Sequence, residues 1–209
     1  MDQPVGVLAL QGDFANHERA LRSAGLATRR VRRPADLQGL AGIVLPGGES
    51  TTMLKLLAVQ RLEQPLGEFL RSGVPVLATC AGLILCAQSV VDPGQRSYGV
   101  LDIAVARNGY GRQICSGTFP LEVQPQLGAT AWRGVFIRAP RILSVGEHCE
   151  ILAIRGSDPV LVRQGAVLGA CFHPEIETDH PLIGIFADLV RNSRLDQRRP
   201  QGSVLEESC

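Results

Sequence analysis

One cysteine in this chain lies where a reactive thiol would be expected. Cys80 follows an apolar, β-prone run at residues 74–77 and precedes Ala81 and Gly82, after which the apolar pattern continues. Small residues allow a sharp strand-to-helix turn, which sets the thiol at a helix N-terminus where unpaired N–H groups favour the thiolate. Taken alone, a cysteine in an apolar run is more often a buried hydrophobic side chain. Cys80 is therefore a candidate nucleophile that needs partners elsewhere.

A base and a carboxylate follow a second strand-like run at residues 166–172. His173 and Glu175 are separated only by Pro174. In an extended segment, residues two apart point to the same side, and the proline disfavours helix at His173. A cysteine nucleophile needs an imidazole, and the imidazole needs a carboxylate to orient it. His-Pro pairs also begin ordinary loops. His173 and Glu175 therefore indicate catalysis only in combination with Cys80.

A pair of glycines follows a third apolar run. Residues 46–48 read Pro-Gly-Gly, and Glu49, Ser50 and Thr51 then open a helix. Paired glycines let backbone N–H groups point at a developing oxyanion. A phosphate-binding loop is excluded because no Gly-Lys-Ser/Thr follows. A plain turn before a Ser/Thr-capped helix explains the stretch equally well.

Strand-like and helix-like runs alternate in the first half of the chain. Apolar runs begin at residues 5, 42 and 74, and helical patterns follow at about 15–24, at about 51–57 and after the cysteine. This order predicts an α/β fold with a parallel sheet covered by helices. After residue 98, shorter runs indicate antiparallel strands around the sheet edge, and a final helix is expected at about 182–192.

The three motifs share one position in this scheme. Gly48, Cys80 and His173 each lie just past the end of a strand-like run. In open parallel sheets, the carboxyl ends of the strands form the binding site. We therefore expect these residues to meet at that edge.

Composition limits the classes of function. The 209 residues, 45% of them hydrophobic, predict one domain with a substantial core. A net charge of +1 argues against nucleic acid as the main partner, and the arginines within residues 29–33 indicate a solvated edge or a protein contact. No apolar run approaches the roughly 20 residues that span a bilayer, and no signal-peptide pattern is present. We expect no membrane association and a cytoplasmic location.

The remaining polar residues predict little chemistry. The six cysteines show no zinc spacing, so reduced thiols are expected. His17, in the first expected helix, is interpreted as a surface residue. Residues 194–209 are rich in Arg, Gln, Gly, Ser and Glu, which indicates a disordered tail after a domain at residues 1–193.

In this order, PGGEST, TCAG and HPE resemble the motifs of class I (triad) glutamine amidotransferases. More narrowly, the chain is similar to the family of glutaminase subunits of pyridoxal 5'-phosphate synthase. That similarity runs from residue 5 to about residue 190 and rests on VGVLALQGDFANHERAL, LPGGESTTM, ATCAGLILCA, LDIAVARNGYGRQ, VFIRAP and FHPEIETDH. It implies a three-layer fold, with a mostly parallel sheet covered by helices and antiparallel edge strands.

The resemblance also implies roles for individual residues. Cys80 would be the nucleophile, His173 the general base and acid, and Glu175 the residue that orients His173. Gly48 and the backbone N–H of Ala81 would hold the oxyanion. The implied L-glutamine-binding residues are Gly48, Glu49, Ser50, Arg107, Ile137 and Arg138. From its residue type alone, Arg107 or Arg138 would be interpreted as part of a surface ion pair.

The resemblance implies no cofactor and no metal, and it implies a partner. Ammonia would pass to a synthase subunit, and the glutaminase would be weak until that subunit docks. Residues 46–49 could supply the switch, and the helix that carries Arg19 and Arg22 could supply a docking surface. The sequence departs from the family pattern at Gly109-Tyr110 and at Gly117-Thr118-Phe119. The resemblance implies that these residues belong to the wall of the glutamine pocket.

Two alternatives stay open. The chain could be a triad amidotransferase that serves another acceptor, or a non-catalytic regulatory protein of the same fold.

Overall fold

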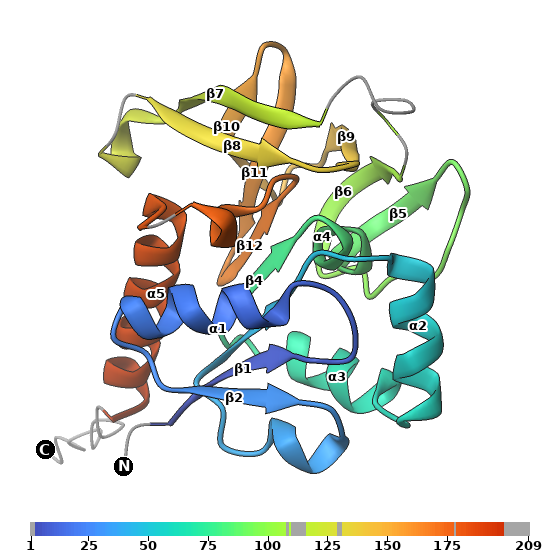
Figure 1. Ribbon diagram of the computed structural model, residues 1–209, viewed down its shortest axis with the longest axis vertical. Coiled ribbons are helices and arrows are strands. Elements are labelled where there is room, and N and C mark those ends of the chain that lie inside the picture. The colour runs from blue at the N-terminus through green and yellow to red at the C-terminus, as the bar shows by residue number, and fades with distance from the viewer. Residues whose placement is uncertain (1–2, 108, 110–115, 129–130, 178, 199–209) are drawn as a thin grey trace, which may run out of the picture.

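The computed structural model describes residues 3–107, 109, 116–128, 131–177 and 179–198. Within them, a nine-stranded sheet crosses the molecule in the order β2-β1-β3-β4-β12-β11-β10-β7-β8 (Figure 1). Neighbours from β2 to β12 are parallel, and neighbours from β12 to β8 are antiparallel. The strands are β1 (Val5–Leu8), β2 (Thr28–Val31), β3 (Gly42–Leu45), β4 (Val76–Thr79), β7 (Gly117–Val123), β8 (Trp132–Phe136), β10 (Glu150–Arg155), β11 (Asp158–Gln164) and β12 (Val167–Ala170). The expected α/β fold is confirmed.

A second, three-stranded sheet lies beside the main one. It consists of β5 (Ala87–Val91), β6 (Leu101–Ala106) and β9 (Arg141–Val145), in that order. β5 and β6 are parallel, whereas β6 and β9 are antiparallel. The sequence analysis indicates antiparallel strands only after residue 98, so it did not predict β5, the parallel pairing of β5 with β6 or a separate sheet.

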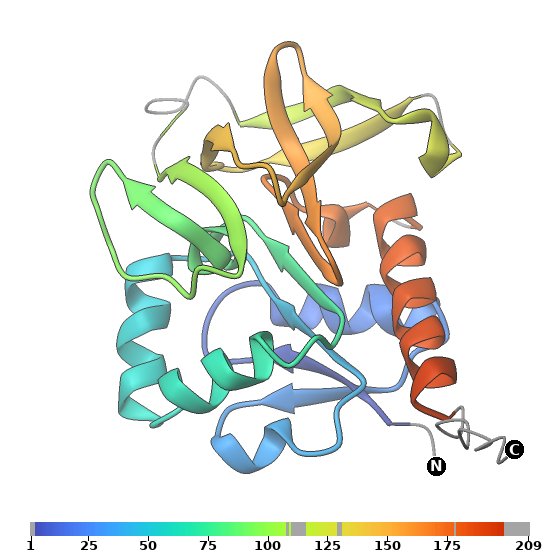
Figure 2. The same ribbon diagram turned by 180° about the vertical axis from the view of Figure 1, so that it is seen from behind.

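Helices cover both faces of the parallel half. α1 (Phe14–Ser23) and α5 (Pro181–Arg198) lie against one face, and α3 (Glu63–Leu70) lies on the opposite face (Figures 1 and 2). α2 (Ser50–Val59) follows β3, and α4 (Ala81–Cys86) follows β4. Short 3₁₀ turns occur at η1 (Pro34–Leu37), η2 (Pro125–Leu127) and η3 (Pro174–Ile176).

The last helix is longer than the sequence analysis expects. α5 continues to Arg198, so residues 194–198 are helical rather than part of a disordered tail. Arg, Leu and Gln are good helix formers, and Arg194 donates a hydrogen bond to the Gln3 carbonyl. Residues 199–209 lie outside the described part of the chain.

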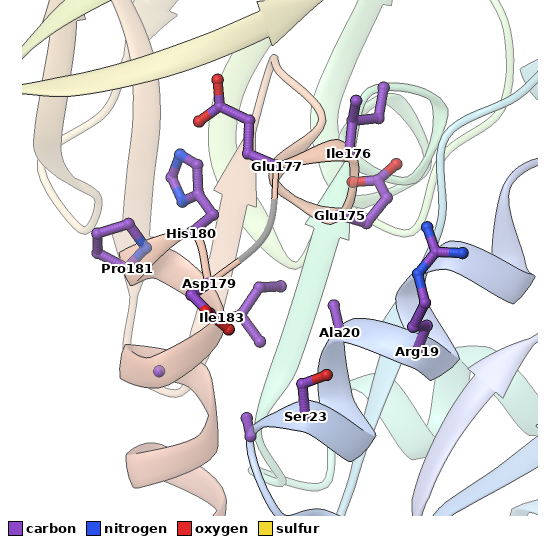
Figure 3. Close-up of a pocket in the computed structure, with 12 residues that line it drawn as sticks. Arg19, Ala20, Ser23, Glu175, Ile176, Glu177, Asp179, His180, Pro181 and Ile183 are labelled. Atoms are coloured by element: carbon purple, nitrogen blue, oxygen red, sulfur yellow. The ribbon is translucent and has the colours of Figure 1, made fainter.

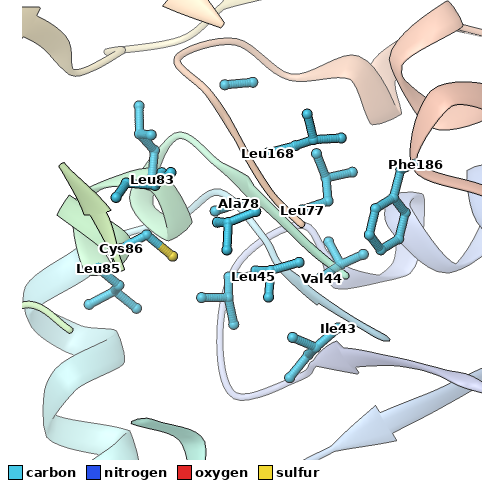
Figure 4. Close-up of a cluster of buried hydrophobic side chains, with 14 of the residues drawn as sticks. Ile43, Val44, Leu45, Leu77, Ala78, Leu83, Leu85, Cys86, Leu168 and Phe186 are labelled. Carbon is cyan, nitrogen blue, oxygen red and sulfur yellow. The ribbon is translucent and has the colours of Figure 1, made fainter. Parts of the chain in front are cut away.

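The core lies on both sides of the central strands. β1, β3, β4 and β12 are buried at every position, as parallel strands between two helical layers should be. Phe186 of α5 lies near Leu77 and Leu168 on one side of the strands, while Leu45 lies toward Leu83 on the other (Figure 4). This packing fixes the strand ends that carry the candidate motifs.

Two arginines of the cluster lie on the edge strand β2, and the other two follow it. Arg29 and Arg30 are exposed there, and Arg30 forms an ion pair with Glu18 at 2.8 Å. The interpretation as a solvated edge agrees with this position. None of the helices in the described ranges is long and apolar enough to cross a membrane.

Candidate active site

The turn at Cys80 has the strained backbone of a nucleophile elbow. Cys80 lies between β4 and α4 with φ 48° and ψ −104°, and positive φ at a residue with a side chain is costly and clusters at functional sites. Hydrogen bonds hold both ends of the turn, from Cys80 N to Ala170 O (2.9 Å) and from Ile84 N to Cys80 O (3.2 Å). The expected sharp strand-to-helix turn is therefore present.

Gly82 brings this elbow against the neighbouring strand. A Cβ atom at Gly82 would lie 2.1 Å from the carbonyl oxygen of Leu45, at the end of β3. No side chain fits in that space, so α4 can begin directly beside β3. The close approach keeps Cys80 next to the loop that follows β3.

His173 and Glu175 form the expected pair, but on a different backbone. His173 Nδ1 lies 2.8 Å from Glu175 Oε1, and both residues are buried. The expectation of an extended segment was wrong, because η3 begins directly after His173. The fixed φ of proline suits the first position of a helical turn. The carboxylate therefore reaches the imidazole through a turn that Pro174 starts.

Cys80 and His173 both pack against the bare backbone of Gly47. A Cβ atom at Gly47 would lie 2.4 Å from His173 Cε1 and 3.4 Å from Cys80 Cβ. Burial alone would lower the pKa of His173, but its interactions with Cys80 and Glu175 raise this pKa to about 10. The neighbouring sulfur and carboxylate therefore favour the imidazolium form of His173, as in the cysteine–histidine pairs of enzymes with a nucleophilic cysteine.

His17 is buried beside Glu175, which corrects its interpretation as a surface residue. Its Nε2 lies 3.2 Å from Glu175 Oε2 and 3.1 Å from Thr79 Oγ1. Burial alone would raise the pKa of Glu175, but the charge of His17 and the interactions with His173 lower this pKa to about 2. The position of His17 four residues before the buried Leu21 was the signal that could have found it.

The loop at residues 9–13, between β1 and α1, packs against the loop at residues 46–49, between β3 and α2. A Cβ atom at Gly12 would lie 1.8 Å from the carbonyl oxygen of Gly47, and Asp13 N donates to the same oxygen at 3.3 Å. The N–H and C=O of a trans peptide point in opposite directions, so this contact fixes the direction of the Gly48 N–H. The Gln11 side chain packs against Gly48. The N-terminal turn therefore sets the geometry of the expected oxyanion donor.

Glu49 caps α2 and pairs with Arg107. Its carboxylate accepts hydrogen bonds from Thr51 N (3.1 Å) and Thr52 N (2.6 Å), and Arg107 Nη2 lies 3.1 Å from Oε1. Burial alone would raise the pKa of Glu49, but hydrogen bonds from Thr52 and Thr51 lower this pKa to about 2. Arg107 thus forms an ion pair, yet its side chain is only 16% exposed.

Ser50 and residues 137–138 line the same cavity as Cys80. Ser50 is buried, and its hydroxyl donates a hydrogen bond to Gln95 Oε1 at 2.9 Å. The Cys80 thiol lies 3.9 Å from the Ile137 carbonyl oxygen. Arg138 has a φ of 44°, so a second strained residue lies next to the elbow.

One cavity of about 260 Å³ brings most of the predicted residues together. Those that line it are Gly48, Glu49, Ser50, Cys80, Arg107, Ile137, Arg138 and His173. Glu175 is buried behind His173, and Ala81 is fully buried in the elbow. Asp13, Ile84 and Ile176 also line the cavity and were missed by the sequence analysis.

A second cavity, of about 280 Å³, lies between α1 and the start of α5 (Figure 3). Arg19 and Ser23 line it from α1, and His180 lines it from the opposite side. Neither Cys80 nor His173 reaches this cavity, so the candidate chemistry belongs to the first one.

Part of the expected pocket wall lies outside the described residues, namely Asn108 and Tyr110. Gly109 packs on Arg141, where a Cβ atom would lie 2.2 Å from the arginine Cβ. Phe119 packs edge-on against Phe136, with ring centroids 5.8 Å apart, and does not line the cavity. Over the residues that the structure describes, no cluster of three or more His, Cys, Asp or Glu could hold a metal ion.

Comparison with known proteins gives consistent matches. Residues 7–191 match the model of the SNO glutamine amidotransferase family. A protein from Streptomyces griseus named "Pyridoxal 5'-phosphate synthase subunit PdxT" is 48% identical over 193 residues, which cover 91% of this chain and 98% of the relative. A protein of the same name from Thermotoga maritima is 44% identical over 187 residues, 90% of this chain and 99% of the relative.

A solved structure gives the same result. A crystal structure described as glutamine amidotransferase has a TM-score of 0.82 and 44% identity to this chain. The match covers 90% of this chain and 98% of that chain.

We expect Gly47→Ala to slow alkylation of Cys80 by iodoacetamide at pH 7 by roughly tenfold or more, a rate effect of about 1.4 kcal/mol. The added methyl group would push His173 away from the thiol. Peptide mass spectrometry after timed exposure measures the rate. Gly184→Ala is the control, because a Cβ atom there meets nothing within 4 Å. A folded Gly47→Ala protein that reacts at the wild-type rate would show that the two side chains are not coupled.

The lowered pKa of Glu175 predicts part of the acid sensitivity of the fold. A carboxylate with a pKa of about 2 in the folded protein and about 4.5 unfolded stabilises the fold above pH 4.5, and this contribution is lost between pH 4.5 and 2. In Glu175→Gln, the free energy of unfolding should therefore fall less steeply over that range. Denaturant titrations at several pH values measure both slopes. Parallel slopes for the two proteins would contradict the assignment.

Proposed function

The chain belongs to the SNO glutamine amidotransferase family, and on that premise we propose that it hydrolyses the side-chain amide of L-glutamine to glutamate and ammonia. The observation that carries the proposal is the single cavity where the strained Cys80 meets His173 with Glu175 hydrogen-bonded behind it. We assign the activity to the one domain expected at residues 1–193, which the structure extends through α5 to Arg198. No step of the proposed reaction needs a cofactor or a metal.

The proposed reaction proceeds through a thioester. The Cys80 thiolate attacks the amide carbonyl carbon, and the negative charge that develops on the carbonyl oxygen is held by the backbone N–H groups of Gly48 and Ala81. His173 protonates the departing ammonia and then takes a proton from water, which releases glutamate and regenerates the thiol. Glu175 keeps Nδ1 of His173 occupied, so that Nε2 is free to move protons.

The polar wall of the cavity suits a free amino acid. Arg107 and Arg138 offer guanidinium groups for the α-carboxylate of glutamine. The Ile137 carbonyl and the Glu49 carboxylate offer oxygen atoms for the α-ammonium group. Because Glu49 already accepts three hydrogen bonds from Thr51 and Thr52 and pairs with Arg107, we infer that it acts as a fixed charge.

The relatives named as pyridoxal 5'-phosphate synthase subunits indicate where the ammonia would go. We propose that this chain is the glutaminase subunit of a pyridoxal 5'-phosphate synthase complex, and that ammonia passes directly to the synthase subunit. Free ammonia would be protonated in water and diffuse away, which is a physical reason for a complex. We place the reaction in the cytoplasm, where the free thiols at Cys80, Cys86, Cys149 and Cys171 stay reduced.

We expect Cys80→Ala to abolish glutamate formation from glutamine, because it removes the atom that forms the thioester. The variant should still fold and bind the synthase subunit, since only a small side chain is lost. A coupled glutamate assay with the synthase subunit present measures the loss. Cys86→Ala is the control, because that thiol is buried away from the cavity and burial raises its pKa to about 12. Glutamate production by purified Cys80→Ala protein would refute the assignment.

We expect Arg19→Glu to weaken binding of the synthase subunit and glutamine-dependent synthesis, but not synthesis from added ammonium salt. Arg19 is exposed on α1, whereas Arg22 bonds Thr28 Oγ1 at 3.0 Å and lies 3.7 Å from Glu18, so reversing Arg22 also disturbs the helix.

Calorimetry of the two purified subunits measures this binding. Arg61→Glu, at the end of α2 away from the site, is the matched charge reversal and should bind normally. Equal affinity of the Arg19 variant and the wild type would move the interface elsewhere.

A further inference from the structure

His17 is a buried polar residue that the proposed reaction does not use. Its side chain has no exposed surface, and a polar group buried so deeply costs free energy unless it has partners. Its Nε2 faces two such groups, Thr79 Oγ1 at 3.1 Å and Glu175 Oε2 at 3.2 Å. Both partners belong to the candidate site rather than to the helix that carries His17.

The two oxygens of Glu175 face two different histidines. Oε1 lies 2.8 Å from His173 Nδ1, and Oε2 faces His17 Nε2. Within the described part of the chain, Oε2 makes no hydrogen bond of ordinary geometry. The polar group that the structure places next to this oxygen is therefore His17 Nε2. Removing the His17 nitrogen would leave a carboxylate oxygen buried and bare, and the carboxylate would then turn toward other donors.

His17 also links the two segments that must stay in register. Thr79 is the last residue of β4, directly before Cys80, and Glu175 lies in η3, directly after His173. One imidazole nitrogen therefore contacts the strand that carries the nucleophile and the turn that carries the base. Its position on α1, which packs beside η3, fixes this bridge from a third element.

We propose that His17 is a positioning residue that holds the Glu175 carboxylate on His173 and ties it to the end of β4. The proposal rests on the proposed glutaminase function. In the Nε2–H form, His17 offers its proton to Thr79 and Glu175, while its Nδ1 has no partner among the described residues.

The charges around this contact come from several elements. The low pKa of Glu175, to which the charge of His17 contributes most among the interactions that lower it, agrees with the bridge. The other titratable or charged groups that face the Glu175 region are His173, Cys80, His180, Glu177, Arg19 and Asp179.

The test compares three substitutions that differ in where they place a nitrogen. His17→Leu removes the donor, His17→Asn keeps a polar group too short to reach the Nε2 position, and His17→Gln can place an amide N–H close to it. With the synthase subunit present, we expect Leu and Asn to lower kcat for glutamine roughly 10- to 100-fold, the range for losing one close polar contact to a buried charged group. KM should stay unchanged, because the glutamine-binding wall is untouched, and Gln should restore most of kcat.

A second readout does not depend on turnover. The pH at which Cys80 reaches half of its maximal alkylation rate should rise in the Leu and Asn variants, because a loosened Glu175 stabilises the His173 imidazolium less well. His180→Leu is the matched control. His180 is also buried, but its ring bonds the Arg133 carbonyl at 2.9 Å and Leu182 N at 3.2 Å. Its loss should lower Tm and leave the alkylation profile in place.

The outcomes separate the two proposals. An active wild-type complex with unchanged kcat and unchanged alkylation profiles in the His17 variants overturns the positioning role. If His17→Leu fails to fold, the comparison of His17→Asn with His17→Gln decides the same question, and equal behaviour of the two overturns it. A wild-type complex that never hydrolyses glutamine overturns the proposed function, while the alkylation profiles still test the contact between His17 and Glu175.

Discussion

The parallel pairing of β4 with β12 is the constraint on which the candidate site depends. Thr79 lies opposite Ala170 in this ladder, and Cys80 N bonds the Ala170 carbonyl. Residues 80 and 173 are far apart in sequence, and this register brings them to one edge of the sheet. A slip of one residue would turn every buried side chain of the strand to the other face, so the core that fixes the register also fixes the distance between thiol and imidazole.

The polar side chains behind the cavity form one buried network. His17 contacts Glu175, Glu175 contacts His173, and His173 lies next to Cys80 over the backbone of Gly47. Charges buried in this way are stable only when each has a partner, so the members depend on one another. The network joins α1, η3 and the turn at Cys80. The electrostatic environment of the thiol therefore depends on how all three pack together.

Much of this arrangement could be predicted from the sequence, because strand ends and glycines have local signatures. Gly48, Cys80 and His173 follow apolar runs, and parallel strands gather such ends at one edge. The pairing of His173 with Glu175 was also predicted, although through an extended segment rather than a turn. His17 was missed because the inward face of a short helix depends on what packs against it. The approach of Gly12 to Gly47 leaves no pattern that a single sequence displays.

Three glycines build this site from main-chain atoms. Gly12, Gly47 and Gly82 each stand where a Cβ atom would overlap a carbonyl oxygen or the imidazole. At Gly47, which lines the cavity, Cys80 and His173 therefore pack against bare backbone. A ligand that rests on Gly47 would contact main-chain atoms that no point mutation can remove, and a larger residue at any of the three positions would displace the atoms that it overlaps. Substitutions that alter ligand contacts without displacing this backbone are therefore left to the other side chains of the cavity wall, such as Arg107 and Arg138.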